Sequence, residues 1–375
     1  MAEVGLDPGH ASFWESDESL VLTNPRDPAV AAARAAMLEC DWCALGAPGL
    51  PSAGLVGFLT SGTTGHPKVI GFTRHALLAS ARAVNDALGV KPDSVWLRVL
   101  PRFHVGGFQV ESRAWAARAT LVTTDGAWDP VAFDPLCRSH GVTHVSLVPT
   151  QVFDLVQNER RAPPSLQVVL VGGGELHPAL AARARTLGWP VRASYGLTEA
   201  ASTVAVQDPT ETDVRSLTLL PHWQADVAPD GRLLLNGPAL PAALAVWNSE
   251  ANRYHCLPFM PPLRTSDRVH LQGNILRFLE RADRVVKRLG ELIDLAQLER
   301  ALAGAAIEAG AFGRVCLRGE PDARSGHRLV LECLDAAEGA TVAARFNSNQ
   351  PPFARIEEIR PVPSLRLTPL GKPSG

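Results

Sequence analysis

The feature that most constrains the fold is an alternation of short apolar runs and helical stretches across residues 55–240. The apolar runs have the length and composition of buried strands, and they are Val95–Leu100, Ala119–Thr123, His144–Val148 and Gln167–Val171. Helical stretches such as Ala76–Leu88 and Pro178–Leu187 lie among them. This alternation predicts an α/β fold with a largely parallel sheet. Ligands usually bind at the carboxyl ends of such strands.

Two further pieces follow this alternating region. The stretch Gly231–Leu240 predicts a strand entering a turn, so we expect a smaller β-rich piece there. Beyond Asp283 the pattern changes and predicts a helix, Leu295–Glu308, with strands near Val315 and Leu329 and at Ile356–Pro361. We therefore predict two domains. The first, 1–282, has mostly parallel sheets, helices and the β-rich piece, and the second, 283–375, is a small mobile α+β domain.

The composition favours a folded protein without nucleic-acid or membrane partners. Of the 375 residues 46% are hydrophobic and 20% charged. The net charge is −2, and the charged residues are scattered along the chain rather than gathered in blocks. No apolar run approaches the roughly 18 residues that span a bilayer, and Met1–His10 lacks the pattern of a signal peptide. We expect a cytoplasmic protein that does not insert stably into a membrane. A homodimer is a possible assembly. The cysteines are too sparse for a disulfide scaffold, and the CxxC spacing of Cys40 and Cys43 is taken as coincidence.

A polar loop, Thr60-Ser-Gly-Thr-Thr-Gly-His-Pro-Lys68, carries the most informative chemistry. It offers hydroxyl donors, glycines that let backbone N–H groups turn inward, and one cation, which together suit a polyphosphate. These residues are Ser61, Gly62, Thr63, Thr64, Gly65 and Lys68. A Walker-type P-loop needs a longer spacing between its glycines and a helix after its lysine. Here strand-like Val69–Thr73 follows, so we expect a loop, not a helix N-terminus, to hold the phosphates.

This loop resembles the phosphate loop of the adenylate-forming superfamily, which includes acyl-CoA synthetases, luciferases and peptide-synthetase adenylation domains. Ser194-Tyr-Gly-Leu-Thr-Glu199 resembles its adenine and metal motif. The resemblance implies that Tyr195 faces the purine, Thr198 the α-phosphate, and Glu199 a Mg²⁺ ion. Gly172-Gly-Gly-Glu-Leu176 resembles the turn beside the adenine, although alone it is also typical of a tight βα turn. The implied ATP/AMP-binding set includes Gly173, Gly174, Glu175, Ser194 and Gly196.

Three later segments continue the resemblance in the family's order. Thr265-Ser-Asp267 resembles the segment whose aspartate, here Asp267, binds the ribose, with Ser266 in place of the usual glycine. In Glu280–Gly290 the resemblance implies that Arg281 reaches the ribose, Asp283 is the hinge and Gly290 faces the CoA tunnel; alone, this run is typical of a charged surface turn. Leu367-Thr-Pro-Leu-Gly-Lys372 resembles the C-terminal motif that carries the catalytic lysine, Lys372.

The acyl site is predicted around Leu100-Pro-Arg-Phe-His-Val-Gly-Gly107, where His104 resembles the gate of acyl-CoA ligases. Alone, His104 could equally be a core histidine. Arg113 follows in a segment, 107–117, that is apolar enough to be a buried helix. A buried cation needs an anionic partner. That partner is either a second carboxylate on the substrate or an internal acid such as Glu111.

The segments His144–Gln151, with Ser146 at the acyl site, and Tyr195–Val204 resemble the o-succinylbenzoate–CoA ligase branch of menaquinone biosynthesis. In that branch an arginine at the Arg113 position faces the second carboxylate of the substrate. The resemblance implies a two-step reaction of a carboxylic acid with ATP, Mg²⁺ and coenzyme A, in which Lys372, Thr198, Glu199 and His104 form the catalytic set. Only 59 residues precede Thr60, so we expect a shortened N-terminal region relative to the family.

Three alternatives stay open from the sequence. The chain could be an acyl-CoA ligase for another aromatic or aliphatic acid. It could load an activated acid onto a carrier-protein thiol. It could also be a non-catalytic homologue that binds a nucleotide, although Lys68, Glu199 and Lys372 argue against this alternative.

Overall fold

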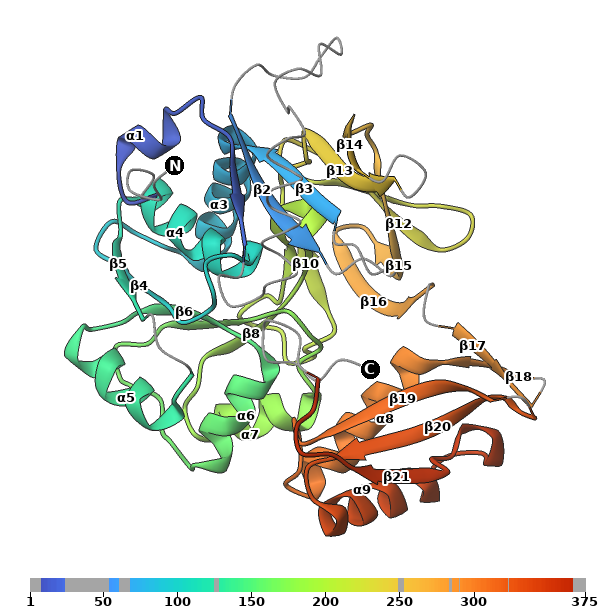
Figure 1. The fold of residues 1–375 in the computed structure, drawn as a ribbon. Helices are drawn as coiled ribbons and strands as arrows, with labels where there is room; N and C mark the ends of the chain where they lie inside the picture. Colours follow the sequence, from blue (N-terminus) through green and yellow to red (C-terminus); the bar gives the residue numbers. More distant parts are fainter. Residues whose placement is uncertain are drawn as a thin grey trace.

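The computed structural model describes residues 8–23, 54–60, 68–124, 128–248, 253–282, 285–289, 291–322 and 324–366. A large sheet and a smaller sheet form the first part of the chain, and a separate α+β unit follows them (Figure 1). A helix predicted around Pro28–Glu39 lies outside the described residues. No helix in the described part of the chain is long and apolar enough to cross a bilayer.

The large sheet has eleven strands and changes character halfway across. Its first five neighbours are parallel: β5 (Thr120–Thr123), β4 (Val95–Arg98), β6 (His144–Leu147), β7 (Val168–Val171) and β8 (Val191–Leu197). The four strands predicted from apolar runs are therefore confirmed. Beyond β8 every pairing is antiparallel, through β9 (Ser202–Val206), β10 (Leu217–Leu219), β16 (Ile275–Arg281), β15 (Leu263–Gln272), β12 (Arg232–Asn236) and β11 (Gln224–Val227).

The β-rich piece expected after the parallel strands is thus not a separate layer. Most of it extends the large sheet, and its remaining hairpin, β13 (Ala243–Asn248) and β14 (Arg253–Pro258), joins a second sheet. That five-stranded sheet also contains β1 (Leu20–Leu22), β2 (Leu55–Thr60) and β3 (Lys68–Thr73). Thr60 pairs with Lys68 across the antiparallel β2–β3 hairpin. The polar loop therefore connects two strands, of which the sequence predicts the second, at Val69–Thr73.

Helices cover both faces of the parallel strands. On one face, α3 (Arg74–Leu88) and α4 (Val105–Ala117) pack against each other and separate the two sheets (Figure 1). On the other face lie α5 (Pro130–Ser139), α6 (Pro149–Gln157) and α7 (Pro178–Thr186). The Thr73 hydroxyl caps α3 by accepting the Ala76 N–H, and the helix ends at Gly89, whose φ of 68° suits glycine. The short helices α1 (Ala11–Trp14) and η1 (Thr198–Ala200) also belong to this part.

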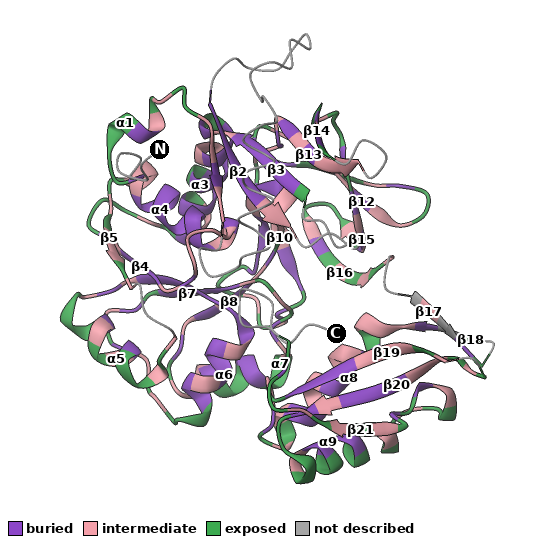
Figure 2. Ribbon diagram, in the orientation of Figure 1, coloured by how far each residue is buried: buried purple, intermediate pink, exposed green. Residues whose placement is uncertain are grey.

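The second part of the chain has a hydrophobic core of its own. A hairpin of β17 (Val285–Arg288) and β18 (Glu291–Asp294) leads into α8 (Leu295–Glu308), the helix that the sequence predicts. Three strands form its sheet: β19 (Val315–Asp322), β20 (Gly326–Cys333) and β21 (Glu358–Pro361). The helices α9 (Ala336–Ser348) and η2 (Pro352–Ala354) lie between β20 and β21 in the sequence. Figure 2 shows the buried residues of this part on β19 and β20 and on the inner sides of its helices. The sequence pattern does not predict α9.

The separate cores give a testable stability prediction. Phe346 is 2% exposed in the second core, and its change to Ala should lower the unfolding free energy of that part by about 3–5 kcal/mol. All eight tryptophans precede residue 248, so tryptophan fluorescence follows only the first part, whereas circular dichroism follows both. In urea, Phe346→Ala should add an early dichroism transition that fluorescence does not detect.

A suitable control is Val131→Ala, because Val131 is 53% exposed on α5. This variant should unfold like the parent protein. If Phe346→Ala instead shifted fluorescence and dichroism together, the two cores would be unfolding as one cooperative unit.

Candidate active site

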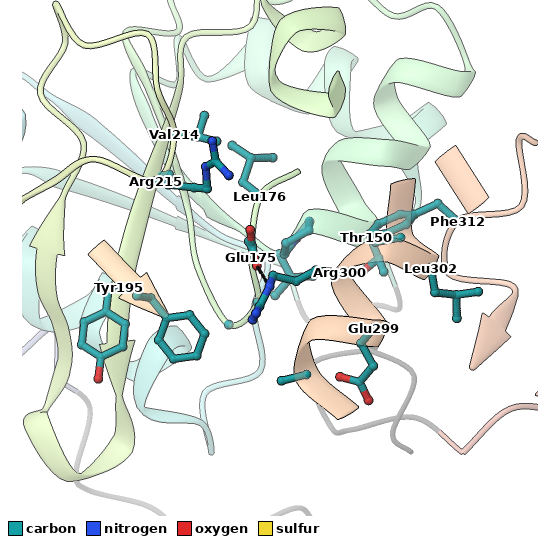
Figure 3. Close-up of a pocket in the computed structure, with 18 of the residues that line it drawn as sticks. Thr150, Glu175, Leu176, Tyr195, Val214, Arg215, Glu299, Arg300, Leu302 and Phe312 are labelled. Atoms are coloured by element: carbon teal, nitrogen blue, oxygen red, sulfur yellow. Dashed lines mark ion pairs between the residues drawn. The ribbon is translucent and has the colours of Figure 1, made fainter. Parts of the chain in front are cut away.

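Two adjoining cavities lie at the carboxyl ends of β6, β7 and β8. The larger, about 410 Å³, is lined by the first part of the chain and by α8 of the second part (Figure 3). The smaller, about 150 Å³, is lined by residues of the first part alone among those that the structure describes. The two share the lining residues Val148, Gly173, Ser194 and Gly196. The two cavities are therefore separated by no more than these residues.

The larger cavity brings together the predicted adenine and ribose residues. Tyr195, at the end of β8, is 9% exposed, and its hydroxyl donates to Oδ2 of Asp267 on β15 at 2.6 Å. Nη1 of Arg281 lies 3.6 Å from Oδ1 of the same carboxylate. Phe278 on β16 stacks on Tyr195 with ring centroids 6.2 Å apart. The site thus offers a flat aromatic face beside a carboxylate and a guanidinium.

Phe278 is a lining residue that the sequence analysis missed. It reaches Tyr195 because β16 pairs with β15, with Val269 opposite Phe278 and Asp267 opposite Arg281. No local signal separates this phenylalanine from a core residue. Only the pairing of the two strands reveals its place.

The Tyr195 phenol stays protonated at neutral pH. Burial raises its pKa well above the ordinary value, and the neighbouring Asp267 carboxylate raises it further. An ionised phenol beside a carboxylate would place two like charges in a largely dry site. Tyr195 therefore acts as a donor that orients Asp267.

The glycine turn after β7 forms the next wall of the larger cavity. Gly173 has a φ of 72°, a conformation that favours glycine, and the Ser194 hydroxyl donates to the Val171 carbonyl at 2.9 Å. Glu175, the last polar residue of the turn, lies 3.7 Å from Nε of Arg300 on α8 (Figure 3). Arg300 also lies over the Phe278 ring, 6.0 Å from its centroid. This arginine from the second part, not predicted from the sequence, faces the adenine turn.

The segment after Tyr195 turns sharply towards the smaller cavity. A Cβ on Gly196 would lie 1.8 Å from the Ser202 carbonyl oxygen, so only glycine fits where β8 meets β9. Thr198 lines the smaller cavity, and Glu199 is partly exposed beside it. Thr60 is half-buried and Lys68 exposed at the ends of the β2–β3 hairpin.

Glu199 fits a magnesium site of the kind expected for a nucleotide enzyme. Among the described residues no cation forms an ion pair with Glu199, and no cluster of three ligating side chains occurs. Mg²⁺ in nucleotide sites is usually held by one or two carboxylates together with the substrate phosphates. A single carboxylate near the end of β8 is consistent with that mode.

Arg113 dominates the smaller cavity. Its side chain, on α4, is 1% exposed, and it donates from Nη1 to the Ser146 hydroxyl at 3.2 Å and from Nη2 to the Thr203 hydroxyl at 3.1 Å. The guanidinium also lies 5.7 Å from the centroid of the Trp96 ring. Burial lowers the pKa of Arg113 to about 9, so it remains a cation at neutral pH. Thr203, which the sequence analysis missed, completes this group from β9.

Glu111, the acid named as an alternative partner for Arg113, does not pair with it. Glu111 instead pairs with Nε of Arg98 at 2.8 Å and with Nε of Arg102 at 3.1 Å. Within the described residues no carboxylate lies at ion-pair distance from Arg113. The two side-chain hydrogen bonds that it makes within the described residues go to neutral hydroxyls, and these do not offset its charge in a buried site.

His104 stands at the N-terminus of α4, next to the smaller cavity. Its neighbours Leu100, Val105 and Gly106 line that cavity, whereas the His104 side chain does not. Burial lowers the pKa of His104 to about 4, so the ring is neutral at physiological pH. Several predicted site residues lie outside the described part of the chain: Ser61, Gly62, Thr63, Thr64, Gly65, Asp283, Gly290 and Lys372.

Comparison with known proteins shows what this chain resembles. Residues 51–233 match the family described as AMP-binding enzyme. Its α/β fold, with a large sheet flanked by helices, agrees with that class.

Individual relatives and solved structures show which enzymes the chain resembles. The chain is 35% identical over 155 residues to 2-succinylbenzoate–CoA ligase of Staphylococcus epidermidis, covering 40% of this chain and 31% of the relative. The matched segment thus spans less than a third of that curated relative's length. A structure of Escherichia coli MenE with bound OSB-AMS has a TM-score of 0.66 at 26% identity, covering 82% of this chain and 65% of the other. The Bacillus subtilis MenE structure in complex with ATP and magnesium, at 22% identity, shares the fold with a TM-score of 0.68, covering 84% and 68%.

The buried Tyr195 gives a prediction for alkaline titration. The chain has two tyrosines, Tyr195 and Tyr254, and burial raises the pKa of both. In an unfolded chain a tyrosine ionises at about pH 10. Because the folded-state pKa values are higher, the folded protein keeps its full stability below that pH and loses stability as the pH rises above it. Tyrosinate absorbance should therefore appear only together with unfolding. Titration of Tyr195 in the folded Tyr254→Phe variant near pH 10 would contradict the assignment.

Proposed function

We propose that the protein is an ATP-dependent acyl-CoA ligase that activates o-succinylbenzoate in menaquinone biosynthesis. In the first step the substrate carboxylate attacks the ATP α-phosphate, which forms an acyl-adenylate and releases pyrophosphate. In the second step the CoA thiol attacks the acyl carbon and expels AMP. One observation carries the choice of substrate: Arg113 is a buried cation, without a described carboxylate partner, at the wall of the smaller cavity.

The larger cavity is proposed as the nucleotide site. Tyr195 and Phe278 would hold the adenine on a flat aromatic surface, and the turn containing Gly173, Gly174 and Glu175 would lie along its edge. Asp267 and Arg281 would bind the ribose hydroxyls, since their polar groups meet at this cavity. Thr60 and Lys68, with Ser61–Gly65, would hold the β- and γ-phosphates. Ser194 and Gly196 line both cavities and Thr198 lines the smaller one, a placement that suits the α-phosphate.

The smaller cavity is proposed as the acyl site. A cavity of roughly 150 Å³ is enough for one benzene ring, and this cavity is about that size. The ring carboxylate of o-succinylbenzoate would pair with Arg113 while Ser146 and Thr203 hold the guanidinium in place. The succinyl carboxylate would then point towards Gly196 and Thr198, where the two cavities join. His104 would act as a neutral gate at the mouth.

Negative charge gathers on the α-phosphate during adenylation, so cations placed there in advance lower the barrier. Lys372 is proposed as one such cation. Mg²⁺ held by Glu199, when bound, would supply the other by screening the phosphate oxygens. The neutral Thr198 hydroxyl would donate to the same phosphate.

We also propose two domains, 1–282 and 283–375, that rotate about Asp283 between the two steps. Each part has its own hydrophobic core, which favours rigid-body motion of one against the other. In one orientation Lys372 would reach the α-phosphate, and in the other Gly290 would face the CoA tunnel. A cytoplasmic location and a homodimer are parts of the same proposal.

Two competing functions can be separated by experiment. A ligase for a mono-acid, or an enzyme that loads a carrier protein, would leave Arg113 without a substrate charge to bind. A non-catalytic nucleotide-binding homologue would bind ATP but form no AMP. The decisive assay measures AMP formation with ATP, Mg²⁺, CoA and a panel of acids that includes o-succinylbenzoate.

The substrate assignment predicts a selective defect in Arg113→Ala. A hydrogen bond to a charged group contributes about 1.5–3 kcal/mol, so kcat/KM for o-succinylbenzoate should fall roughly ten- to a hundred-fold or more. Most of the loss should appear in KM, because the ring carboxylate is ionised in both ground and transition states. Steady-state kinetics of AMP formation measures both constants.

The matched control is a keto-acid that keeps the phenyl ring and succinyl chain but lacks the ring carboxylate. Arg113→Ala should turn over this mono-acid about as well as the parent protein does. If the variant handled o-succinylbenzoate as well as the parent, Arg113 would be structural and the dicarboxylate assignment would be wrong.

The two-step proposal predicts a split effect for Lys372→Ala. Adenylation should be abolished, measured as pyrophosphate release, because the α-phosphate loses its cation. Thioester formation from a supplied acyl-adenylate should continue at close to the parent rate, because Lys372 would not face the site in that orientation. Equal loss of both half-reactions would contradict this role.

A further inference from the structure

A cluster of three charged side chains, two of them buried, lies beside the smaller cavity. Its centre is Glu111, which is 5% exposed on α4. The Glu111 carboxylate pairs with Arg98 on β4 and with Arg102 on the loop before α4, at 2.8 and 3.1 Å. Arg98 is also buried, and its Nη1 donates to the Leu100 carbonyl at 3.2 Å. One carboxylate therefore connects a strand, a loop and a helix.

The connected loop, residues 100–104, forms part of the cavity wall. Leu100 lines the smaller cavity from the loop, and Val105 and Gly106 line it from the first turn of α4. The His104 N–H donates to the Pro101 carbonyl at 3.1 Å, which closes the loop into a turn. A Cβ on Gly107 would lie 2.2 Å from that same carbonyl oxygen, so the loop lies directly against α4.

Stability alone does not account for this cluster. Removing charges from water is costly, and apolar side chains of similar volume often stabilise a protein as well as a buried ion cluster does, or better. What close ion pairs can add is a fixed arrangement, because each holds two charged groups next to each other. Here they fix the loop relative to both β4 and α4.

We propose that Glu111 and Arg102 are positioning residues for the acyl cavity. Glu111 holds Arg102, and through it the loop that carries Leu100 and His104, at the distance from α4 that shapes the cavity. Neither residue lines the cavity. The identity of the ligand rests on the proposed function, whereas the anchoring of the loop does not.

The first test is Arg102→Leu, which removes the loop's tether and leaves Glu111 paired with Arg98. Arg102 has a side chain 37% exposed, so the melting temperature should change little. Hydrogen exchange of the peptide spanning residues 99–108, measured without substrate, should become about three- to tenfold faster. KM for o-succinylbenzoate should rise by a similar factor of about three to ten, while KM for ATP stays at the parent value.

Arg138→Leu is the matched control, since Arg138 forms an ion pair of 2.9 Å with Asp134 on α5. It should leave exchange of the 99–108 peptide and both KM values unchanged. The triple variant Arg98→Leu, Glu111→Leu, Arg102→Leu replaces the whole cluster by apolar groups and should fold with the melting temperature of the parent. It should nevertheless keep the faster loop exchange and the raised KM for the acid.

Parent-like exchange and KM in Arg102→Leu, or in the triple variant, would overturn the inference, because the charges would then only fill space. Failure of the parent protein to form AMP with o-succinylbenzoate would contradict the proposed function instead. The exchange measurement would still decide whether the cluster anchors the loop.

Discussion

The candidate site depends on the reversal of strand direction at β8. This strand pairs in parallel with β7 and in antiparallel with β9. Its carboxyl end therefore opens the crevice typical of parallel sheets, while β9 returns along the edge of the same crevice. Thr203 on β9 and Ser146 on β6 can then each accept a hydrogen bond from the Arg113 guanidinium. Because Gly196 has no Cβ, it can lie against the Ser202 carbonyl where β8 turns back into β9.

The two cavities differ in the charged groups that line them. In the larger one, Asp267 is held between the Tyr195 hydroxyl and Arg281, so a polar sugar meets a carboxylate beside aromatic rings. In the smaller one, Arg113 is buried against neutral hydroxyls, while the nearest acid in sequence, Glu111, is held by Arg98 and Arg102. The first arrangement suits a nucleotide and the second an anion in an apolar pocket.

The fold was largely predictable where one local rule decides the structure. The parallel strands from Val95 to Val171 and the helix α8 follow from hydrophobic periodicity, and strand β3 follows from the strand-like residues after the polar loop. The continuation of the β-rich piece into the large sheet was not predictable, because strand partners far apart in sequence are chosen by packing. The helix α9 was missed although its buried residues Gly339, Val342, Ala343 and Phe346 follow helical spacing.

The sequence alone determined the chemical inventory of the site: the tyrosine, the acids, the glycine turns and a cation in an apolar helix, in an order that resembles a known family. Tertiary structure decided which of these groups meet. Phe278 and Arg300 reach the nucleotide cavity only through strand pairing and the docking of α8. The partner of Arg113 was likewise undecided in the sequence, where Glu111 stands two positions away. On a helix, residues two positions apart do not face each other, and Arg98 and Arg102 already occupy that carboxylate.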